Sequence, residues 1–84
     1  PDHAQAQYQL GKALLDAGQY QQAVEHLELA AKYDPNHDYV HYQLQAAYRK
    51  ASRIEDADRE LEIFKEIKAR KRASAVPSGM GDNP

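Results

Sequence analysis

Two consecutive stretches decide the fold of this chain: PDHAQAQYQLGKALLDAGQYQQAVEHLELAAKYD at 1–34 and PNHDYVHYQLQAAYRKASRIEDADRELEIFKEIK at 35–68. The second stretch repeats the first in an unbroken register, so that position 35 is equivalent to position 1. Identical pairs include Pro1 and Pro35, His3 and His37, Tyr8 and Tyr42, Leu10 and Leu44, Ala13 and Ala47, Ala17 and Ala51, Ala23 and Ala57, and Leu27 and Leu61. A fixed period of this length is typical of stacked helical hairpins, which bury a core between neighbouring units.

Apolar spacing predicts four helices, at 4–17, 20–33, 38–51 and 54–72. Each has an apolar stripe at helical period, which we expect to form the core. The predicted stripes are Ala6, Leu10, Ala13, Leu14 and Ala17; Ala23, Leu27, Ala30 and Ala31; Val40, Leu44, Ala47, Tyr48 and Ala51; and Ala57, Leu61, Phe64 and Ile67. The fold class that follows is all-α, with four antiparallel helices in two hairpins.

The residues between the stripes predict where the helices begin and end. Gly18 suits the left-handed conformation that ends a helix, and Pro35 interrupts the chain between the two units. Ser52 with Glu55 three residues later resembles a capping box, while Asp2 and Asn36 are expected N-caps. The segment 73–84 has two glycines, two prolines and no apolar period, so we expect a flexible tail there.

The composition restricts the function classes. The 84 residues include 13 acidic and 11 basic side chains, and the net charge of −2 argues against a dedicated nucleic-acid binder. The basic run between 65 and 72 is explained by the favourable interaction of cations with a helix C-terminus. The sequence has no cysteine and no apolar run long enough to span a membrane. It also has no phosphate-binding loop and no arrangement of a nucleophile with a base, so we expect neither an enzyme nor a cofactor.

Histidines are the remaining metal-site candidates. His37 and His41 are four residues apart, with Asp38 between them. Two nitrogens and one carboxylate are too few for a closed zinc site, so we expect no metal there.

The residues at these positions resemble the tetratricopeptide repeat (TPR) family. Its pattern of Leu-Gly, small turn residue, aromatic, Ala, large apolar, Ala and Pro is matched by Leu10-Gly11, Gly18, Tyr20, Ala23, Leu27, Ala30 and Pro35. The second unit offers Leu44, Tyr48, Ser52, Ile54, Ala57, Leu61 and Phe64. The resemblance implies an α-solenoid with repeats at 4–37 and 38–72, the last helix being extended. Residues 1–3 then resemble the closing loop of an upstream repeat, so the two units are expected to end a longer array.

The resemblance implies a protein-interaction module, in which the first helix of each repeat lines a concave groove for a peptide or helix of a partner protein. The predicted groove residues are Gln5, Tyr8, Lys12, Leu15, Tyr39, Tyr42, Ala46, Arg49 and Lys50. Tyrosines supply large contact areas, and the basic residues favour an acidic segment. The alternative is that Tyr8, Tyr39 and Tyr42 fill the seam between adjacent repeats.

A second hypothesis is structural. Fewer than about three repeats rarely bury enough surface to be stable alone, so the exposed ends of the stack could self-associate into a homo-oligomer. Ile63, Phe64 and Ile67 near one end, and the first helix at the other, are the expected contacts.

Overall fold

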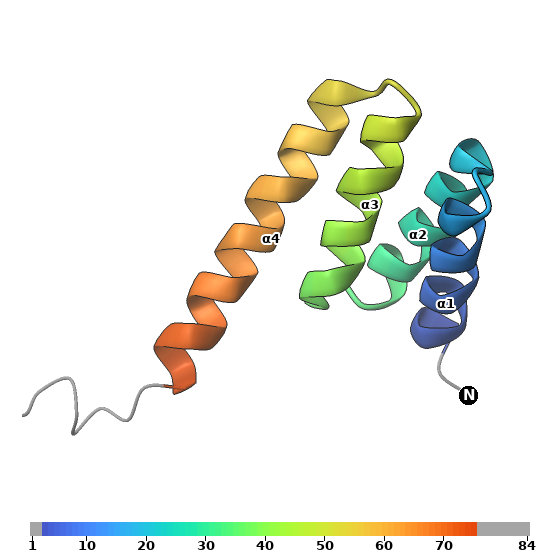
Figure 1. Cartoon of the computed structure of the whole chain (residues 1–84). Coiled ribbons are helices and arrows are strands. Elements are labelled where there is room, and N and C mark those ends of the chain that lie inside the picture. The colour runs from blue at the N-terminus through green and yellow to red at the C-terminus, as the bar shows by residue number, and fades with distance from the viewer. Residues whose placement is uncertain (1–2, 76–84) are drawn as a thin grey trace, which may run out of the picture.

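The computed structural model describes residues 3–75 and confirms the all-α fold. Its helices are α1 (His3–Asp16), α2 (Tyr20–Tyr33), α3 (Asp38–Lys50) and α4 (Ile54–Ala75). Helices α1 and α2 form one antiparallel hairpin, α3 and α4 form the next, and α2 packs against α3 (Figure 1). As a result, α1 and α4 lie at opposite ends of the stack (Figure 1).

The two hairpin turns share one backbone geometry, which corrects the expected role of Ser52. Gly18 has φ of 80° and Ser52, at the equivalent position, has φ of 65°. After Gly18, the Gln19 amide donates to the Leu14 carbonyl at 2.9 Å, and after Ser52 the Arg53 amide donates to the Tyr48 carbonyl at 2.7 Å. This is the Schellman motif, in which a left-handed residue ends a helix. Ser52 therefore terminates α3 and is not the capping-box residue of α4.

Two other helix boundaries also differ from expectation. The N-cap of α3 is His37, without a side-chain capping bond, so Asn36 is not the cap. Helix α4 continues through Ala75, three residues beyond the predicted end, because the alanines and long basic side chains of this segment favour helix. The other expected cap, Asp2, and the rest of the predicted tail lie outside the described residues.

The core is built around α3, which packs against both α2 and α4. Its buried members are Ala23, Val24, Leu27, Leu44, Ala47, Tyr48 and Ala57. Tyr8, Leu14 and Leu15 of α1 are partly buried and pack against this cluster. The predicted stripes of α2 and α3 therefore supply most of the core.

The predicted stripe of α1 is wrong for four of its five members. Ala6, Leu10, Ala13 and Ala17 are exposed, and only Leu14 is partly buried. Instead, Ala4 and Gly11 are the buried residues of α1. Gly11 lies so close to Leu27 that a Cβ atom placed on it would be 2.6 Å from the Leu27 Cγ atom. The missing side chain lets α1 approach α2 through this row, and the alanine–leucine stripe consequently faces away from the core.

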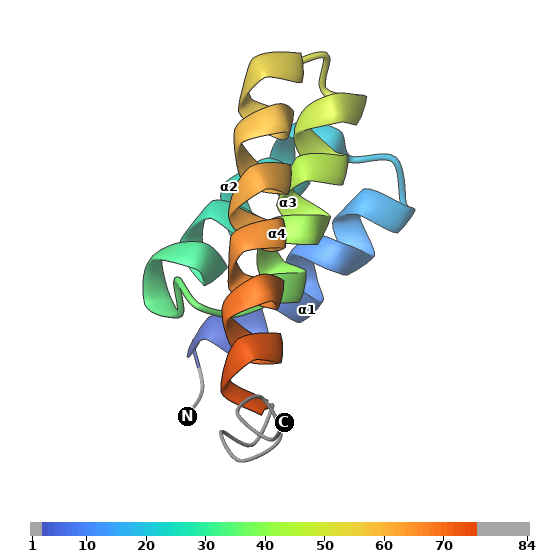
Figure 2. The ribbon, with the colours of Figure 1, turned by 90° about the vertical axis from the view of Figure 1, so that its left-hand side faces the viewer.

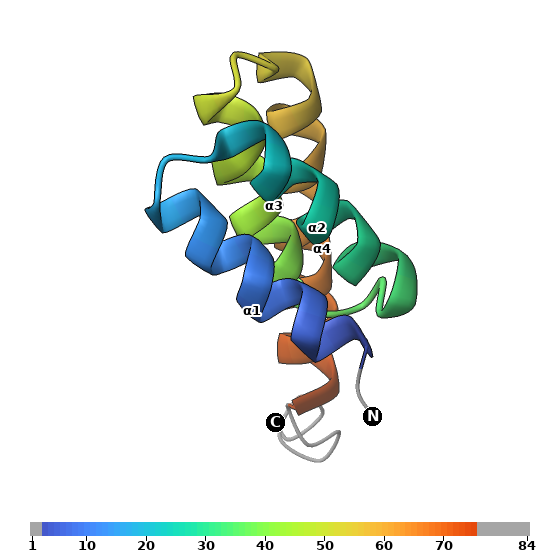
Figure 3. The same ribbon diagram turned by 90° about the vertical axis from the view of Figure 1, so that its right-hand side faces the viewer.

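The first helix of each hairpin thus carries two separate rows of inward- or outward-facing residues. One row contains Gly11, which lies against Leu27 of α2, and the equivalent buried residue of α3, Gln45. The other row is buried in α3, at Val40, Leu44 and Ala47, but exposed in α1, at Ala6, Leu10 and Ala13. The difference arises because α2 packs against α3, whereas no described helix covers this side of α1 (Figure 3).

Candidate functional site

An exposed group of aromatic side chains lies across α3 and α4. Tyr39 and Tyr42 are three residues apart, which places them on one side of α3, and their exposed fractions are 48% and 42%. The ring centroid of Phe64 in α4 lies 5.8 Å from that of Tyr39 and 5.2 Å from that of Tyr42. We call Tyr39, Tyr42 and Phe64 the aromatic patch. The two helices that carry it lie side by side in Figures 1 and 2.

Two lysines of α4 border the aromatic patch. The Lys68 Nζ atom lies 5.2 Å from the ring centroid of Tyr39, within cation–π distance. Lys68 and Lys71 also approach the same Oδ2 atom of Asp38, at 3.9 and 3.5 Å. Asp38 is buried at the start of α3, and its Oδ1 atom accepts a hydrogen bond from the Tyr39 amide at 2.8 Å. A single carboxylate thus neutralises only one of the two lysine ammonium groups, so the group of Asp38, Lys68 and Lys71 at this edge of the patch has a net positive charge.

The predicted groove residues of α3 differ in their surroundings. Ala46 is half-buried, whereas Arg49 and Lys50 are exposed. The Arg49 Nη2 atom pairs with the Asp58 Oδ1 atom at 3.3 Å, so a nearby carboxylate already balances its charge. Lys68, which was not among the predicted groove residues, shares the carboxylate of Asp38 with Lys71 instead of having one of its own.

The predicted groove residues of α1 divide into two groups. Gln5 and Lys12 are exposed, whereas Tyr8 and Leu15 are half-buried against the core. The Tyr8 ring lies 5.4 Å from the ring of His37, which immediately precedes α3. Tyr8 therefore packs between the hairpins, as the alternative interpretation expected for this residue, while Tyr39 and Tyr42 are accessible.

The three residues that were expected to mediate self-association also divide. Ile63 and Phe64 are half-buried, but the exposed fraction of Ile67 is only 3%. Ile67 is thus a core residue of the second hairpin and cannot form an outer contact surface. Phe64 instead joins the two tyrosines that were assigned to the groove. That contact joins α4 to the first turns of α3, and no periodic pattern in the sequence predicts it.

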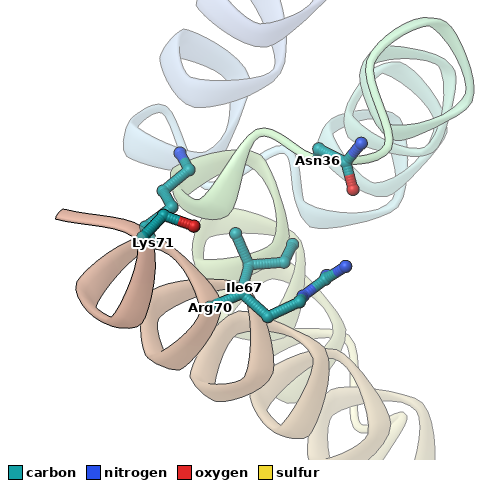
Figure 4. A pocket seen from close by; sticks show the side chains of 5 residues that line it. Asn36, Ile67, Arg70 and Lys71 are labelled. Atoms are coloured by element: carbon teal, nitrogen blue, oxygen red, sulfur yellow. The ribbon is translucent and has the colours of Figure 1, made fainter. Parts of the chain in front are cut away.

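An open depression of about 470 Å³ lies between the α2–α3 loop and the C-terminal part of α4 (Figure 4). Asn36 borders it from the loop, while Ile67, Arg70, Lys71 and Ser74 line it from α4. Because it is wide and shallow, the depression does not enclose a small ligand.

A buried histidine joins α4 to the rest of the second hairpin. The Nδ1 atom of His41 lies 2.6 Å from the Glu60 Oε1 atom, and its Nε2 atom lies 2.6 Å from the Pro35 carbonyl oxygen. The Pro35 carbonyl accepts, and so does Glu60 when it is ionised, so that both ring nitrogens then donate and the imidazole is the charged imidazolium. The hydrogen bond to Glu60 raises the pKa of His41 above its ordinary value; the Pro35 carbonyl and the charge of Asp34 act in the same direction and outweigh burial.

The first hairpin has a polar contact at the equivalent positions. There the Nδ1 atom of His26 lies 2.6 Å from the Gln7 Oε1 atom. Gln7 and His26 occupy, in the first unit of the repeat, the places of His41 and Glu60 in the second. Both hairpins therefore make a polar contact at equivalent positions, but the contact is an ion pair only in the second hairpin. The sequence signal for this contact was a pair of polar residues at the same two places in both units.

Tyr48 makes the polar contact between the hairpins. Its hydroxyl donates to the Glu28 Oε2 atom at 2.5 Å, and the Arg53 guanidinium lies 4.6 Å from its ring centroid. Burial, together with this hydrogen bond, raises the pKa of Tyr48 well above its ordinary range. Tyr48 consequently stays protonated and holds α2 to α3.

Within residues 3–75, no three histidine, aspartate or glutamate side chains converge in a way that could hold a metal ion. Among the same residues, no helix combines the length and the apolar character needed to cross a bilayer.

The family model for the tetratricopeptide repeat matches residues 4–37, and the four helices fit a TPR-type repeat. Searches of curated proteins and of solved structures found no match. Repeats of this family are typically non-enzymatic interaction modules.

Proposed function

Because the chain carries a tetratricopeptide repeat at residues 4–37, we propose that it is a protein–protein interaction module whose aromatic patch binds a peptide segment of a partner protein. The observation that carries this proposal is the exposure of Tyr39 and Tyr42 while both rings rest on Phe64. A ring that is held by a neighbour loses little conformational entropy on binding.

The chemistry of the aromatic patch suits a peptide that has both apolar and polar groups. A tyrosine offers a large apolar face together with a hydroxyl that can bond to a peptide backbone, and tyrosines are common among the residues that dominate binding energy. The patch also extends across two helices, so an extended or helical segment could contact α3 and α4 together.

The charge around the aromatic patch favours an acidic segment. Lys68 and Lys71 share the single carboxylate of Asp38. A carboxylate of the partner would gain a charge-assisted hydrogen bond here, without displacing an existing one-to-one pair.

The test starts with selection of binding peptides from a displayed random library, with the full chain as target. Affinities of the selected peptides are then measured by fluorescence anisotropy for the wild type, Tyr42→Ala and Tyr33→Ala. Tyr33 is the matched control, because it is an exposed tyrosine on α2, away from the patch. We expect about a tenfold loss of affinity for Tyr42→Ala, equivalent to ~1.4 kcal/mol, and none for Tyr33→Ala.

Two results would contradict the proposal. Selected peptides that bind Tyr42→Ala as tightly as the wild type, with circular dichroism showing intact helices, would place binding elsewhere. A selection that enriches basic peptides instead of acidic ones would contradict the charge argument. Replacing Lys68 by Gln is the matching charge test, and we expect it to weaken acidic peptides more than neutral ones.

The alternative function is self-association, for which the same accessible rings are the supporting observation. Light scattering over a dilution series separates the two functions, because a monomer keeps a mass of 9.5 kDa throughout. A mass that rises with concentration in the wild type, but not in Tyr39→Lys, would assign the aromatic patch to a homo-oligomer contact. A constant monomeric mass leaves the peptide-binding function.

A further inference from the structure

The open depression between the α2–α3 loop and α4 is lined by hydrogen-bond donors (Figure 4). Arg70 and Lys71 are cationic, while Asn36 carries a side-chain amide and Ser74 a hydroxyl. Ile67, which is almost completely buried, completes the described lining. The described lining therefore contains no carboxylate, and its chemistry is that of an anion-binding surface.

The cations of this depression belong to a part of α4 that the first unit lacks. In the register of the repeat, Arg70 and Lys71 are equivalent to Asn36 and His37, where the chain forms the loop before α3. Helix α4 instead continues through Ala75, so that its last turns extend beyond the start of α3 (Figure 1). The depression is consequently a feature of this chain and does not follow from the repeat.

The charges beside the depression are mostly positive. Lys71 and Lys68 approach the same Oδ2 atom of Asp38, at 3.5 and 3.9 Å. With the guanidinium of Arg70, three cations and one carboxylate give this group a net charge of +2. Glu66, one turn before Arg70, borders a neighbouring depression and does not line this one. A ligand that carries more than one negative charge is therefore favoured.

We propose that the depression binds a phosphorylated serine or threonine side chain within a segment of a partner protein. A phosphate group on a side chain carries about −1.5 to −2 charges at neutral pH, together with three acceptor oxygens. It matches the charge and the donors of the depression better than a carboxylate does. The guanidinium of Arg70 can donate two parallel hydrogen bonds to one phosphate. Because the C-terminal end of a helix is partially negative, the side chains alone must hold the anion here.

The shape of the depression favours a protein segment over other sources of phosphate. A wide, open depression does not enclose a small ligand, whereas a peptide can contact the loop and α4 together. A bilayer with anionic lipids attracts every exposed cation near its surface and needs no depression. Arg72 is such an exposed cation of α4, and it does not line the depression. The contrast between Arg70 and Arg72 therefore separates the two sources.

The test titrates the isotope-labelled full chain with a short alanine peptide that has one central phosphoserine, and amide chemical shifts are recorded by NMR. Matched peptides carry unmodified serine or glutamate at the centre. We expect saturable shifts at Asn36 and at 70–74, none with the serine peptide, and about tenfold weaker binding of the glutamate peptide. Arg70→Ala should weaken binding about tenfold, and Arg70→Lys should weaken it less. Arg72→Ala removes the same charge outside the depression and should leave binding nearly unchanged.

Three results would overturn the proposal. The first is the absence of saturable shifts up to about 10 mM phosphopeptide. The second is an equal loss of affinity in Arg70→Ala and Arg72→Ala, which would show attraction by charge alone. The third is cosedimentation with vesicles containing phosphatidylserine that both variants reduce alike, without shifts from the phosphopeptide, because the cations would then serve a membrane surface. Tyr42→Ala should bind the phosphopeptide normally, so the result is independent of the aromatic patch.

Discussion

Replacing His41 by Gln tests the charged contact that joins α4 to the rest of the second hairpin. Gln is the residue at the equivalent position in the first hairpin, so the repeat tolerates its size and shape. In the wild type, the imidazolium donates to Glu60 and to the Pro35 carbonyl, both at 2.6 Å. A glutamine amide can donate to one of these acceptors, but its own oxygen would face the other.

The expected cost follows from the loss of one charged hydrogen bond. Such a bond contributes roughly 1.5–3 kcal/mol, and the Glu60 side chain, 17% exposed, regains little hydration. We therefore expect His41→Gln to lower the free energy of unfolding by about 2 kcal/mol in mildly acidic solution. That is a substantial part of the stability of a chain of this size.

The cost should depend on pH with a defined sign. The pKa of His41 is raised in the folded protein, chiefly by Glu60. Its contribution to stability is therefore complete below the unfolded value of 6.5 and is lost as the pH rises through the folded value. The slope of this loss cannot exceed ~1.4 kcal/mol per pH unit. The difference between wild type and His41→Gln should consequently shrink above pH 6.5.

Urea unfolding followed by far-ultraviolet circular dichroism, at several pH values on both sides of 6.5, measures this difference. The matched control is His26→Gln, because His26 faces the neutral amide of Gln7 instead of a carboxylate. A cost of His41→Gln that is constant over this range, or that grows with pH, would refute the assignment of an imidazolium between two acceptors.

Three further substitutions test the packing and the turns. Gly11→Ala should lower the free energy of unfolding by about 1–2 kcal/mol, despite the better helix propensity of alanine, because its Cβ would meet Leu27 at 2.6 Å; an unchanged urea midpoint would show that α1 shifts freely. Ser52→Gly should raise the free energy of unfolding by about 0.5–1 kcal/mol, because glycine adopts the left-handed backbone without strain, and this should be seen as a higher melting temperature. Gly18→Ala should lower the free energy of unfolding for the same reason. Tyr48→Phe should cost about 1 kcal/mol through the lost bond to Glu28, and a double-mutant cycle with Glu28→Gln should show coupling.

Several parts of the candidate site could be anticipated from the repeat. Tyr42 could be singled out because it is equivalent to Tyr8, whereas Tyr39 is equivalent to Gln5; both tyrosines of α3 are exposed. The contact with Phe64 could not be anticipated, because it depends on how closely α3 and α4 approach each other. The same applies to Lys68, which the sequence shows only as one member of a basic run.

The sequence by itself determined the local structure of this protein. The period of the repeat, with Gly18 ending a helix and Pro35 separating the units, specifies four helices in two hairpins, because backbone preferences act within a few residues. That Ser52 ends α3 in the same way as Gly18 was seen only in the structure. Only the tertiary structure decided which apolar row is covered. Leu10 and Leu44 are equivalent in sequence, yet one is exposed and the other buried, since burial depends on which neighbouring helix packs against the row.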